Sequence, residues 1–168
     1  SGVDYDLRKA APYLDYDLFD FESVTGERGD CMDRYLVRLE EMRQSAKIVR
    51  QAIAELPDGP VNSDNRDYVL PPHAQVLSSM EELIHHFKLI SEGIRPPLGQ
   101  VYTAIEAPKG ELGFYLVSDG SAHPYRCKIR SPSFNNLQIL RTMLEGCMIA
   151  DAVAIIASLD PVMGECDR

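Results

Sequence analysis

The sequence has 168 residues and a formal net charge of −9, with 45% hydrophobic and 26% charged residues. This length and composition are typical of one globular domain with its own core. The negative charge argues against nucleic-acid binding, which needs basic patches for the phosphates, and against adsorption to an anionic membrane by charge alone. The longest apolar run, near Met148–Ile156, is interrupted by Asp151 and is too short to span a bilayer. No secretory signal is visible at the N-terminus.

Several kinds of site have no motif in the sequence. The four cysteines are widely spaced and form no C-x-x-C pair, so we expect free thiols rather than zinc or iron–sulfur ligands: Cys31, Cys127, Cys147 and Cys166. There is no G-x-G-x-x-G motif, no P-loop and no G-x-S-x-G motif. We therefore expect neither Rossmann-type nor P-loop nucleotide binding by this chain.

The N-terminal part predicts a lead-in followed by a helix start. Residues 1–15 have no sustained period, and the aromatic, loosely alternating segment Tyr16–Val24 favours a short strand. A turn is expected at Gly26–Gly29. Asp30 then stands where a helix N-cap belongs, with Asp33 three residues later as the analogue of a capping box.

The next segment predicts a long amphipathic helix that ends at Pro57–Pro60. Apolar residues recur at spacings of 3, 4, 3, 4, 3, 4 and 3 and form one stripe: Met32, Tyr35, Leu39, Met42, Ala46, Val49, Ile53 and Leu56. The Arg- and Glu-rich remainder of residues 33–55 is either a solvated face or an interface with another subunit.

Residues 57–77 are rich in proline and predict a surface loop. Ser78 and Glu81 form a capping box that predicts the start of a second helix, with Gly93 near its end. Its apolar stripe is expected to be buried and consists of Met80, Leu83, Ile84, Phe87 and Ile90. The adjacent pair His85 and His86 is not spaced to chelate one metal from a helix, and solvation or a subunit contact is the favoured interpretation.

The C-terminal half predicts a small sheet and then two helices. Short strands are expected at Val101–Ala107, Leu112–Ser118 and Tyr125–Arg130, joined by turns into an antiparallel meander. Helices follow at Phe134–Glu145 and Met148–Leu159, and the second is apolar nearly all round and should be buried. Asp151 in that helix either complements the helix dipole or is a buried protonatable group. The fold class is thus α+β, mainly helical.

The last nine residues carry a motif: Asp160-Pro161-Val162-Met163-Gly164-Glu165-Cys166-Asp167-Arg168. They resemble the Asp-Pro-Cys-x-x-Cys-x-x-His/Arg signature of nickel–iron hydrogenase large subunits. Asp160, Pro161 and Arg168 are in register, whereas Val162 and Glu165 occupy the positions of the two thiolates that a soft nickel site requires. Cys166 lies one position away from the second thiolate. The resemblance therefore implies a retained pocket without its metal.

A second segment, Glu106-Ala107-Pro108-Lys109-Gly110-Glu111, resembles the hydrogenase Glu-x-Pro-Arg-Gly element, with Lys109 in place of Arg. With four further segments, these motifs resemble the C-terminal part of the D-subunit family of NADH-quinone oxidoreductase (respiratory complex I), over residues 1–168. The further segments are Ser1–Lys9, Arg28–Tyr35, Leu83–Lys88 and Tyr115–Gly120. The resemblance favours a longer parent protein, since the chain opens with Ser-Gly rather than Met.

This resemblance implies a hydrogenase large-subunit-like helical core and a role in electron transfer to quinone coupled to proton translocation. Expected partners are the B subunit with its terminal [4Fe–4S] cluster, the C subunit and the membrane-arm H subunit. FMN and NADH would be bound by other subunits, and this chain would bind no cofactor or metal. The location would be peripheral, on the cytoplasmic side of a bacterial inner membrane or the matrix side of a mitochondrial one.

The site residues follow from the same resemblance. Asp160, Val162, Met163, Gly164 and Arg168 would line the quinone cavity. We expect burial to raise the pKa of Asp160 and make it a proton donor. The resemblance places the better proton donors, a His and a Tyr, in another part of the family's chain.

Glu106 and Lys109 would flank the pocket. Without the resemblance, the two side chains would be interpreted as a solvated salt pair of the hairpin. Lys109 is a point charge and does not replace the planar arginine fork, so its role is open.

Three alternatives remain. The chain could belong to an active nickel–iron hydrogenase, which the missing thiolates argue against. It could belong to a related membrane-bound complex that takes electrons from ferredoxin. It could also be a purely structural module. The fragment alone is expected to be inactive and prone to association through its exposed apolar stripes.

Overall fold

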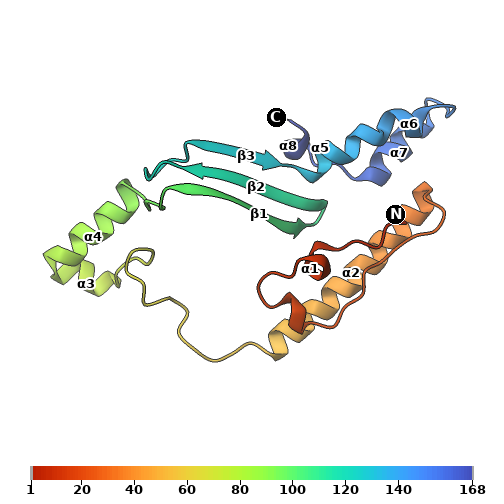
Figure 1. Cartoon of the computed structure of the whole chain (residues 1–168). Coiled ribbons are helices and arrows are strands. Elements are labelled where there is room, and N and C mark those ends of the chain that lie inside the picture. The colour runs from red at the N-terminus through yellow and green to blue at the C-terminus, as the bar shows by residue number, and fades with distance from the viewer. Residues whose placement is uncertain (1, 168) are drawn as a thin grey trace. The chain divides into compact units, whose positions relative to one another are not determined.

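The computed structural model describes residues 2–167. The chain divides into two compact units. The first comprises the residues up to Leu56, Thr103–Phe114 and the residues from Ile129 onward, and the second comprises Pro57–Tyr102 and Tyr115–Lys128. Helices and parts of a small sheet make up both units, so the α+β fold class is confirmed (Figure 1).

Three strands form one antiparallel sheet in the order β1-β2-β3, as the meander prediction required (Figure 1). The strands are β1 (Gly99–Ala107), β2 (Gly110–Ser118) and β3 (Arg126–Arg130). Pro108 and Lys109 form the two-residue turn between β1 and β2. This tight turn belongs to the first unit, where it positions the Lys109 side chain.

Helix α2 spans Cys31–Ala54 and begins at the predicted cap. The Asp33 N–H donates to Oδ1 of Asp30 over 2.7 Å. Asp33 departs from the capping-box pattern, because its carboxylate accepts the N–H groups of Arg28 (3.1 Å) and Gly29 (3.0 Å) rather than that of the cap residue. The helix start and the turn before it are therefore one hydrogen-bonded unit.

Gly26 completes this turn by leaving room for Asp33. A Cβ atom on Gly26 would overlap Oδ2 of Asp33, at a separation closer than any real contact of that kind. A side chain at residue 26 would therefore require the Asp33 carboxylate to shift from its present position beside the two upstream N–H groups.

The lead-in to α2 contains the short helices α1 (Leu7–Ala10) and η1 (Tyr16–Leu18), and the strand predicted at Tyr16–Val24 is wrong. The backbone N–H groups of this segment bond to glutamine side chains on α2 instead of a neighbouring strand. Asp20 donates to Gln51 over 2.8 Å, and Glu22 donates to Gln44 over 3.1 Å. Glutamine side chains satisfy these backbone groups as a strand partner would.

The C-terminal part of the first unit is helical: α5 (Pro132–Asn136), η2 (Leu137–Ile139), α6 (Leu140–Leu144), α7 (Asp151–Leu159) and α8 (Met163–Cys166). Two helices were predicted here at Phe134–Glu145 and Met148–Leu159. The burial expected for α7 is wrong, because among its described side chains only Ile155 is buried and Val153 is 74% exposed. The Asp151 side chain accepts the N–H of Met148 over 3.1 Å, which supports its interpretation as a helix-start residue.

The second unit contains α3 (His73–Ser78) and α4 (Met80–Ser91). The stretch expected to be a loop thus ends in a helix, and Ser78 closes α3 instead of capping α4. The apolar residues of α4, expected to be buried, are exposed; Phe87 is 66% exposed. Part of the polar face is covered: Glu82 pairs with Arg66 at 2.6 Å, and Nε2 of His85 is buried without a hydrogen-bond partner. His85 is half-buried and its Nε2 atom is shielded from solvent, so full solvation is not observed, and the subunit contact stays a prediction.

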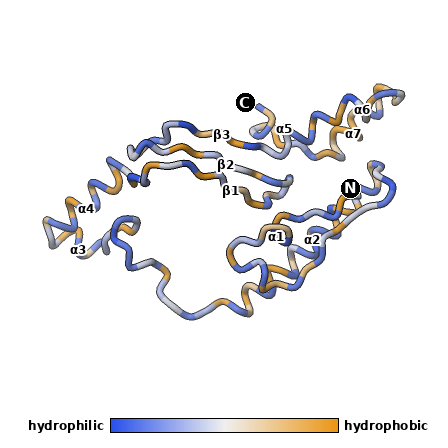
Figure 2. The backbone as a smooth tube through the Cα atoms, viewed as in Figure 1, coloured by the Kyte–Doolittle hydropathy of each residue, from blue (hydrophilic) through white to orange (hydrophobic). Residues whose placement is uncertain are grey.

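Few apolar side chains are buried in the part of the chain that the structure describes. The buried hydrophobic residues, all in the first unit, are Leu7, Phe21, Ile48 and Ile155. Much of the apolar stripe of α2 lies at the surface, and Figure 2 shows hydrophobic residues recurring along that helix. Contiguous apolar surface of this kind marks a site of association.

Candidate functional site: the corner after α7

A left-handed residue, Asp160, ends α7 and begins the C-terminal tail. Its φ and ψ are 50° and 56°, and its N–H donates to the carbonyls of Ile156 (3.3 Å) and Ala157 (3.1 Å). Asp is one of the few residue types that tolerate this conformation, and Pro161 cannot continue the helix. The chain therefore turns sharply here.

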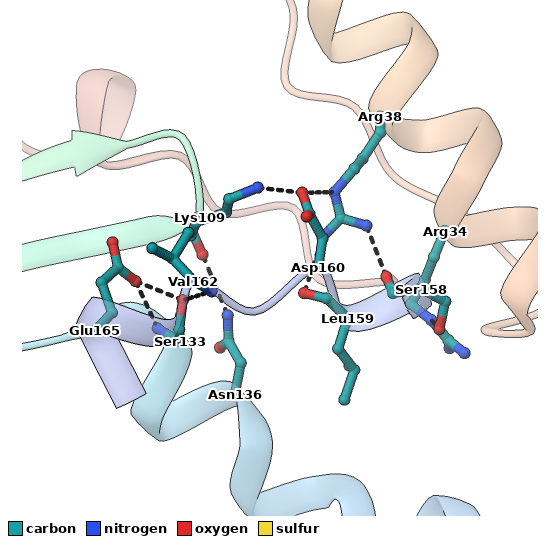
Figure 3. A network of polar contacts seen from close by, with 10 residues as sticks. All are labelled: Arg34, Arg38, Lys109, Ser133, Asn136, Ser158, Leu159, Asp160, Val162 and Glu165. Atoms are coloured by element: carbon teal, nitrogen blue, oxygen red, sulfur yellow. Dashed lines mark hydrogen bonds and ion pairs between the residues drawn. The ribbon is translucent and has the colours of Figure 1, made fainter. Parts of the chain in front are cut away.

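Lys109 and Arg38 hold the Asp160 carboxylate. The Lys109 ammonium donates to Oδ2 of Asp160, and Nε of Arg38 lies 3.8 Å from the same oxygen (Figure 3). These residues come from the β1–β2 turn, from α2 and from the end of α7. The hydrogen bond from Lys109 is the main reason that the pKa of Asp160 lies below its ordinary value. The expected rise in this pKa is therefore wrong: the carboxylate is 47% exposed and paired with cations.

Two arginines of α2 bind the last turn of α7. Arg38 donates to the carbonyl oxygens of Ser158 (2.7 Å) and Leu159 (3.4 Å), and Arg34 donates to the Ser158 hydroxyl over 3.0 Å. Cations at a helix C-terminus satisfy free carbonyl groups and complement the helix dipole. The solvated-face interpretation is thus wrong for Arg34 and Arg38, because they attach α7 to α2.

A second set of contacts fixes the tail beyond Asp160. Ser133 is 2% exposed; its hydroxyl donates to the Glu165 carboxylate over 2.5 Å, and its N–H donates to the same oxygen over 3.1 Å. Ser131 donates to the Glu165 carbonyl over 2.5 Å, and the Val162 N–H donates to the Ser133 hydroxyl over 3.3 Å. Four hydrogen bonds thus join the start of α5 to the tail. Figure 3 shows those made by Ser133.

The two positions that would carry thiolates in a hydrogenase therefore have different environments. Glu165 is engaged with serines, whereas the Val162 side chain is 40% exposed. Met163 is 79% exposed and, with Gly164, Cys166 and Asp167, lines a shallow hollow of about 370 Å³. Val162 and Met163 give the tail an apolar outer surface. Arg168, the last of the expected cavity residues, lies outside the described residues.

Glu106 and Lys109 do not form the salt pair that the hairpin alone suggested. The Glu106 carboxylate accepts the N–H of Leu7 over 3.2 Å, and its own N–H donates to the Tyr13 hydroxyl over 3.0 Å. Partial burial raises the pKa of Glu106, and nearby Asp6 adds to the rise. Glu106 therefore attaches the lead-in to β1, while Lys109 attaches the turn to the tail.

A larger hollow of about 500 Å³ lies beside this network, within the first unit. Arg34, Arg38, Ser158 and Leu159 line it together with apolar side chains such as Met143. The described residues contain no group of three or more His, Cys, Asp or Glu side chains placed to hold a metal ion.

Comparison with known proteins decides the family. The sequence model described as the respiratory-chain NADH dehydrogenase 49 kDa subunit matches residues 1–168. The chain belongs to this family. The resemblance to the D-subunit family of NADH-quinone oxidoreductase is therefore confirmed.

Three similar proteins are named as the D subunit of NADH-quinone oxidoreductase. The protein of Methylacidiphilum infernorum is 57% identical over 168 residues, which are 100% of this chain and 40% of the relative. The Geotalea uraniireducens protein is 56% identical, and that of Wolbachia from Brugia malayi is 55% identical, each over all of this chain and 43% of the relative. The chain thus spans about two-fifths of the length of these curated relatives.

The motif analysis of this 49 kDa subunit segment found Asp160, Lys109 and Glu106 but missed Arg34, Arg38, Ser131 and Ser133. The serines precede a predicted helix and carried a capping signal, and the arginines are spaced i, i+4 on α2. Neither signal indicates the distant residue that is contacted. Among residues 2–167, no helix combines the length and the apolar character needed to cross a bilayer.

Proposed function

We propose that this chain is part of a complex I subunit and that its tail, residues 160–168, forms one wall of the quinone-binding cavity. The supporting observation is the double attachment of the tail. Lys109 and Arg38 hold it at Asp160, and Ser131 and Ser133 hold it at Glu165. A cavity wall requires a fixed backbone with an apolar outer surface, and Val162, Met163 and Gly164 would supply that surface.

In this proposal Asp160 acts as an anchor rather than as the proton donor for reduced quinone. Its pKa lies below the ordinary value, so the carboxylate is ionised at neutral pH and cannot donate a proton there. Reduction of a quinone consumes two electrons and two protons, and the protons would come from residues in another part of the full-length subunit. Lys109 and Arg38 would offset negative charge that develops on the quinone oxygens.

The same proposal explains why the hydrogenase-like motif lacks its thiolates. Glu165 uses a carboxylate oxygen to bind Ser133, and Val162 has no donor atom. A hard oxygen ligand and a hydrocarbon do not form a soft nickel site. We infer that the tail of an ancestral metal site was kept as a structural wall, and that the two ligand positions now serve attachment and apolar contact.

The proposed partners follow from the family. The B subunit would carry the terminal [4Fe–4S] cluster beside the cavity, and the C and H subunits would adjoin. Other subunits would bind FMN and NADH. The chain would associate peripherally with the membrane complex on the cytoplasmic side, or on the matrix side in a mitochondrion.

Binding of a quinone analogue to the assembled full-length complex tests the proposal. Val162→Met would enlarge the apolar surface of the wall and should weaken binding of the analogue several-fold. Val153→Met makes the same change at an exposed position of α7 and serves as the control. If the two variants bind the analogue equally well, the tail is not a cavity wall, and a purely structural role takes its place.

A further inference from the structure

We propose that the apolar stripe of α2 is the docking surface for another α-helix, which lies in the further sequence of the full-length subunit. The α2 stripe consists of Met32, Tyr35, Leu39, Met42, Ala46, Val49 and Ile53. The docking helix is defined by its chemistry: apolar residues at alternating spacings of three and four, and acidic residues seven positions apart beside them.

Exposure is the first observation. Met32, Tyr35, Met42, Val49 and Ile53 are each more than half exposed, between 56% and 72%. These large apolar side chains follow one another along a single face of a 24-residue helix. Water contact with a continuous apolar surface of this length is unfavourable, and covering it stabilises the protein.

The other faces of α2 already have contacts. Arg34 and Arg38 bind the end of α7, and Gln44 and Gln51 bind the lead-in. These contacts do not cover the α2 stripe, which remains an open apolar surface of the first unit.

The spacing of the stripe identifies a helix as its occupant. Alternation of three and four residues gives an average repeat of 3.5, so the stripe runs nearly straight along the helix. Two helices with this repeat pack side by side at a crossing angle of about 20°, with each apolar side chain in a gap of the other helix. The six intervals from Met32 to Ile53 extend over roughly 30 Å, which suits another long helix.

Charge defines the residues that flank the occupant's stripe. On one side the α2 stripe is flanked by Leu36, Arg43 and Arg50, at intervals of seven residues. On the other side it is flanked at the same interval by Arg38, which is bound to the end of α7, and by Ser45 and Ala52. Arg43 pairs with Glu40 at 2.7 Å, but both side chains remain well exposed, so this surface pair is weak. A docking helix with two acidic residues seven positions apart would pair with both arginines.

A second copy of α2 would lack this complementarity. In an antiparallel pair, Arg43 and Arg50 of the two copies would face one another. In a parallel pair, Arg43 of one copy would face Arg38 of the other. Like charges beside an apolar seam oppose association, so the stripe favours a helix of different sequence.

The further sequence of the subunit can supply such a helix. The curated relatives are more than twice as long as this chain, which covers 43% of the Geotalea uraniireducens protein. In a full-length protein the docking helix would already occupy the stripe, and this distinguishes it from a helix of another subunit.

Two synthetic helical peptides of four heptads test the proposal against the 168-residue chain. Both have leucine at the stripe positions; one has glutamate at the flanking positions and the other has lysine. Fluorescence anisotropy of the labelled peptides gives their affinities. The expected result is roughly tenfold tighter binding of the glutamate peptide, although the chain has a net charge of −9 that favours the lysine peptide in general.

Charge reversal locates the binding surface. The double variant Arg43→Glu, Arg50→Glu should invert the preference. The control, Arg95→Glu with Arg141→Glu, makes the same change in net charge on exposed side chains outside α2 and should keep it. Met42→Glu with Val49→Glu should abolish binding of both peptides, and circular dichroism would verify that α2 remains helical.

Four results would overturn the proposal. Equal binding of both peptides would remove the charge argument, and binding unaffected by the Met42 and Val49 substitutions would place the contact elsewhere. A stable dimer of the chain that excludes both peptides would make a second copy the occupant. The full-length Geotalea uraniireducens protein should bind the glutamate peptide at least about tenfold more weakly than the chain; equal affinity would mean that the helix comes from another protein.

Discussion

Lys109 and Asp160 are 51 residues apart in sequence, and their side chains form an ion pair that joins the β1–β2 turn to the corner after α7. Asp160 combines two properties in this contact. Its carboxylate accepts a hydrogen bond from the Lys109 ammonium. Its backbone has the left-handed conformation that ends the helix. Substitutions at residue 160 can separate the two.

Asp160→Asn keeps a residue that tolerates the left-handed conformation and removes the charge. We expect the free energy of unfolding to fall by about 1 kcal/mol or less, because the pair is partly exposed. Asp160→Ala removes the charge and also strains the backbone, so its free energy of unfolding should fall by about 1 kcal/mol more than that of Asp160→Asn. Urea unfolding of the two variants measures the difference. Asp160→Gly, which relieves the strain, should resemble Asp160→Asn; if Ala is as stable as Asn, the left-handed corner contributes nothing.

The ion pair also predicts how stability depends on pH. Lys109 lowers the pKa of Asp160 in the folded protein relative to the unfolded chain. The stabilisation is therefore fully present above the unfolded value, about pH 4, and is lost as the pH falls through the folded pKa. Unfolding measured between neutral pH and about pH 3 should show a smaller acid-induced loss for Asp160→Asn than for the unsubstituted chain. Equal losses in both proteins would contradict this assignment.

Glu106 should show the opposite dependence, because burial raises its pKa. The folded state therefore favours the protonated Glu106 carboxyl. The stability that this preference contributes is present at low pH and is lost as the pH rises through the folded pKa. Glu106→Gln retains an oxygen that can accept the Leu7 N–H and removes the buried charge. The variant should be more stable than the unsubstituted chain at pH 7, by up to about 1 kcal/mol after allowance for partial solvent screening, and equal to it near pH 4. A stability loss at neutral pH would show that the charge itself is needed.

Ser133 tests the second attachment of the tail. Its buried hydroxyl donates to Glu165 and accepts from Val162, so Ser133→Ala should cost about 1–2 kcal/mol of stability. Ser91→Ala is the matched control, because the Ser91 hydroxyl only donates to a carbonyl within its own exposed helix. Hydrogen exchange of the Val162 amide provides a local measurement and should accelerate in Ser133→Ala alone. Unchanged exchange at Val162 would mean that the tail is held by other contacts.

Local signals in the sequence predicted the elements with strong capping or turn chemistry. Asp30 and the proline-rich segment after Leu56 define the two ends of α2, and Pro108 and Lys109 define the turn of the hairpin. Hydrogen-bonding side chains and turn residues act over a few positions, so the sequence alone reveals them. The strand predicted at Tyr16–Val24 was wrong. An alternating pattern suggests a strand, but in this segment the backbone N–H groups of Asp20 and Glu22 donate to Gln51 and Gln44 of α2, and the local sequence does not reveal these distant partners.

Contacts between distant segments could not be predicted in this way. The sequence indicated that Asp160 was a site residue, but it did not indicate Lys109 and Arg38 as its partners. The expected rise in the pKa of Asp160 assumed a dry cavity. In the structure Lys109 and Arg38 lie beside the carboxylate and lower its pKa instead. The exposed stripes of α2 and α4 have a similar cause: periodicity identifies an apolar face, but it does not show whether this chain buries that face.

The turn at Gly26 affects how sequence variation in this family should be interpreted. Any side chain there would displace the Asp33 carboxylate, release the N–H groups of Arg28 and Gly29 and loosen the start of α2. If glycine never varies at this position in the family, the space that Asp33 needs at the start of α2 would explain it. Mutational scans that score Gly26 as intolerant would be detecting a steric constraint at the start of α2.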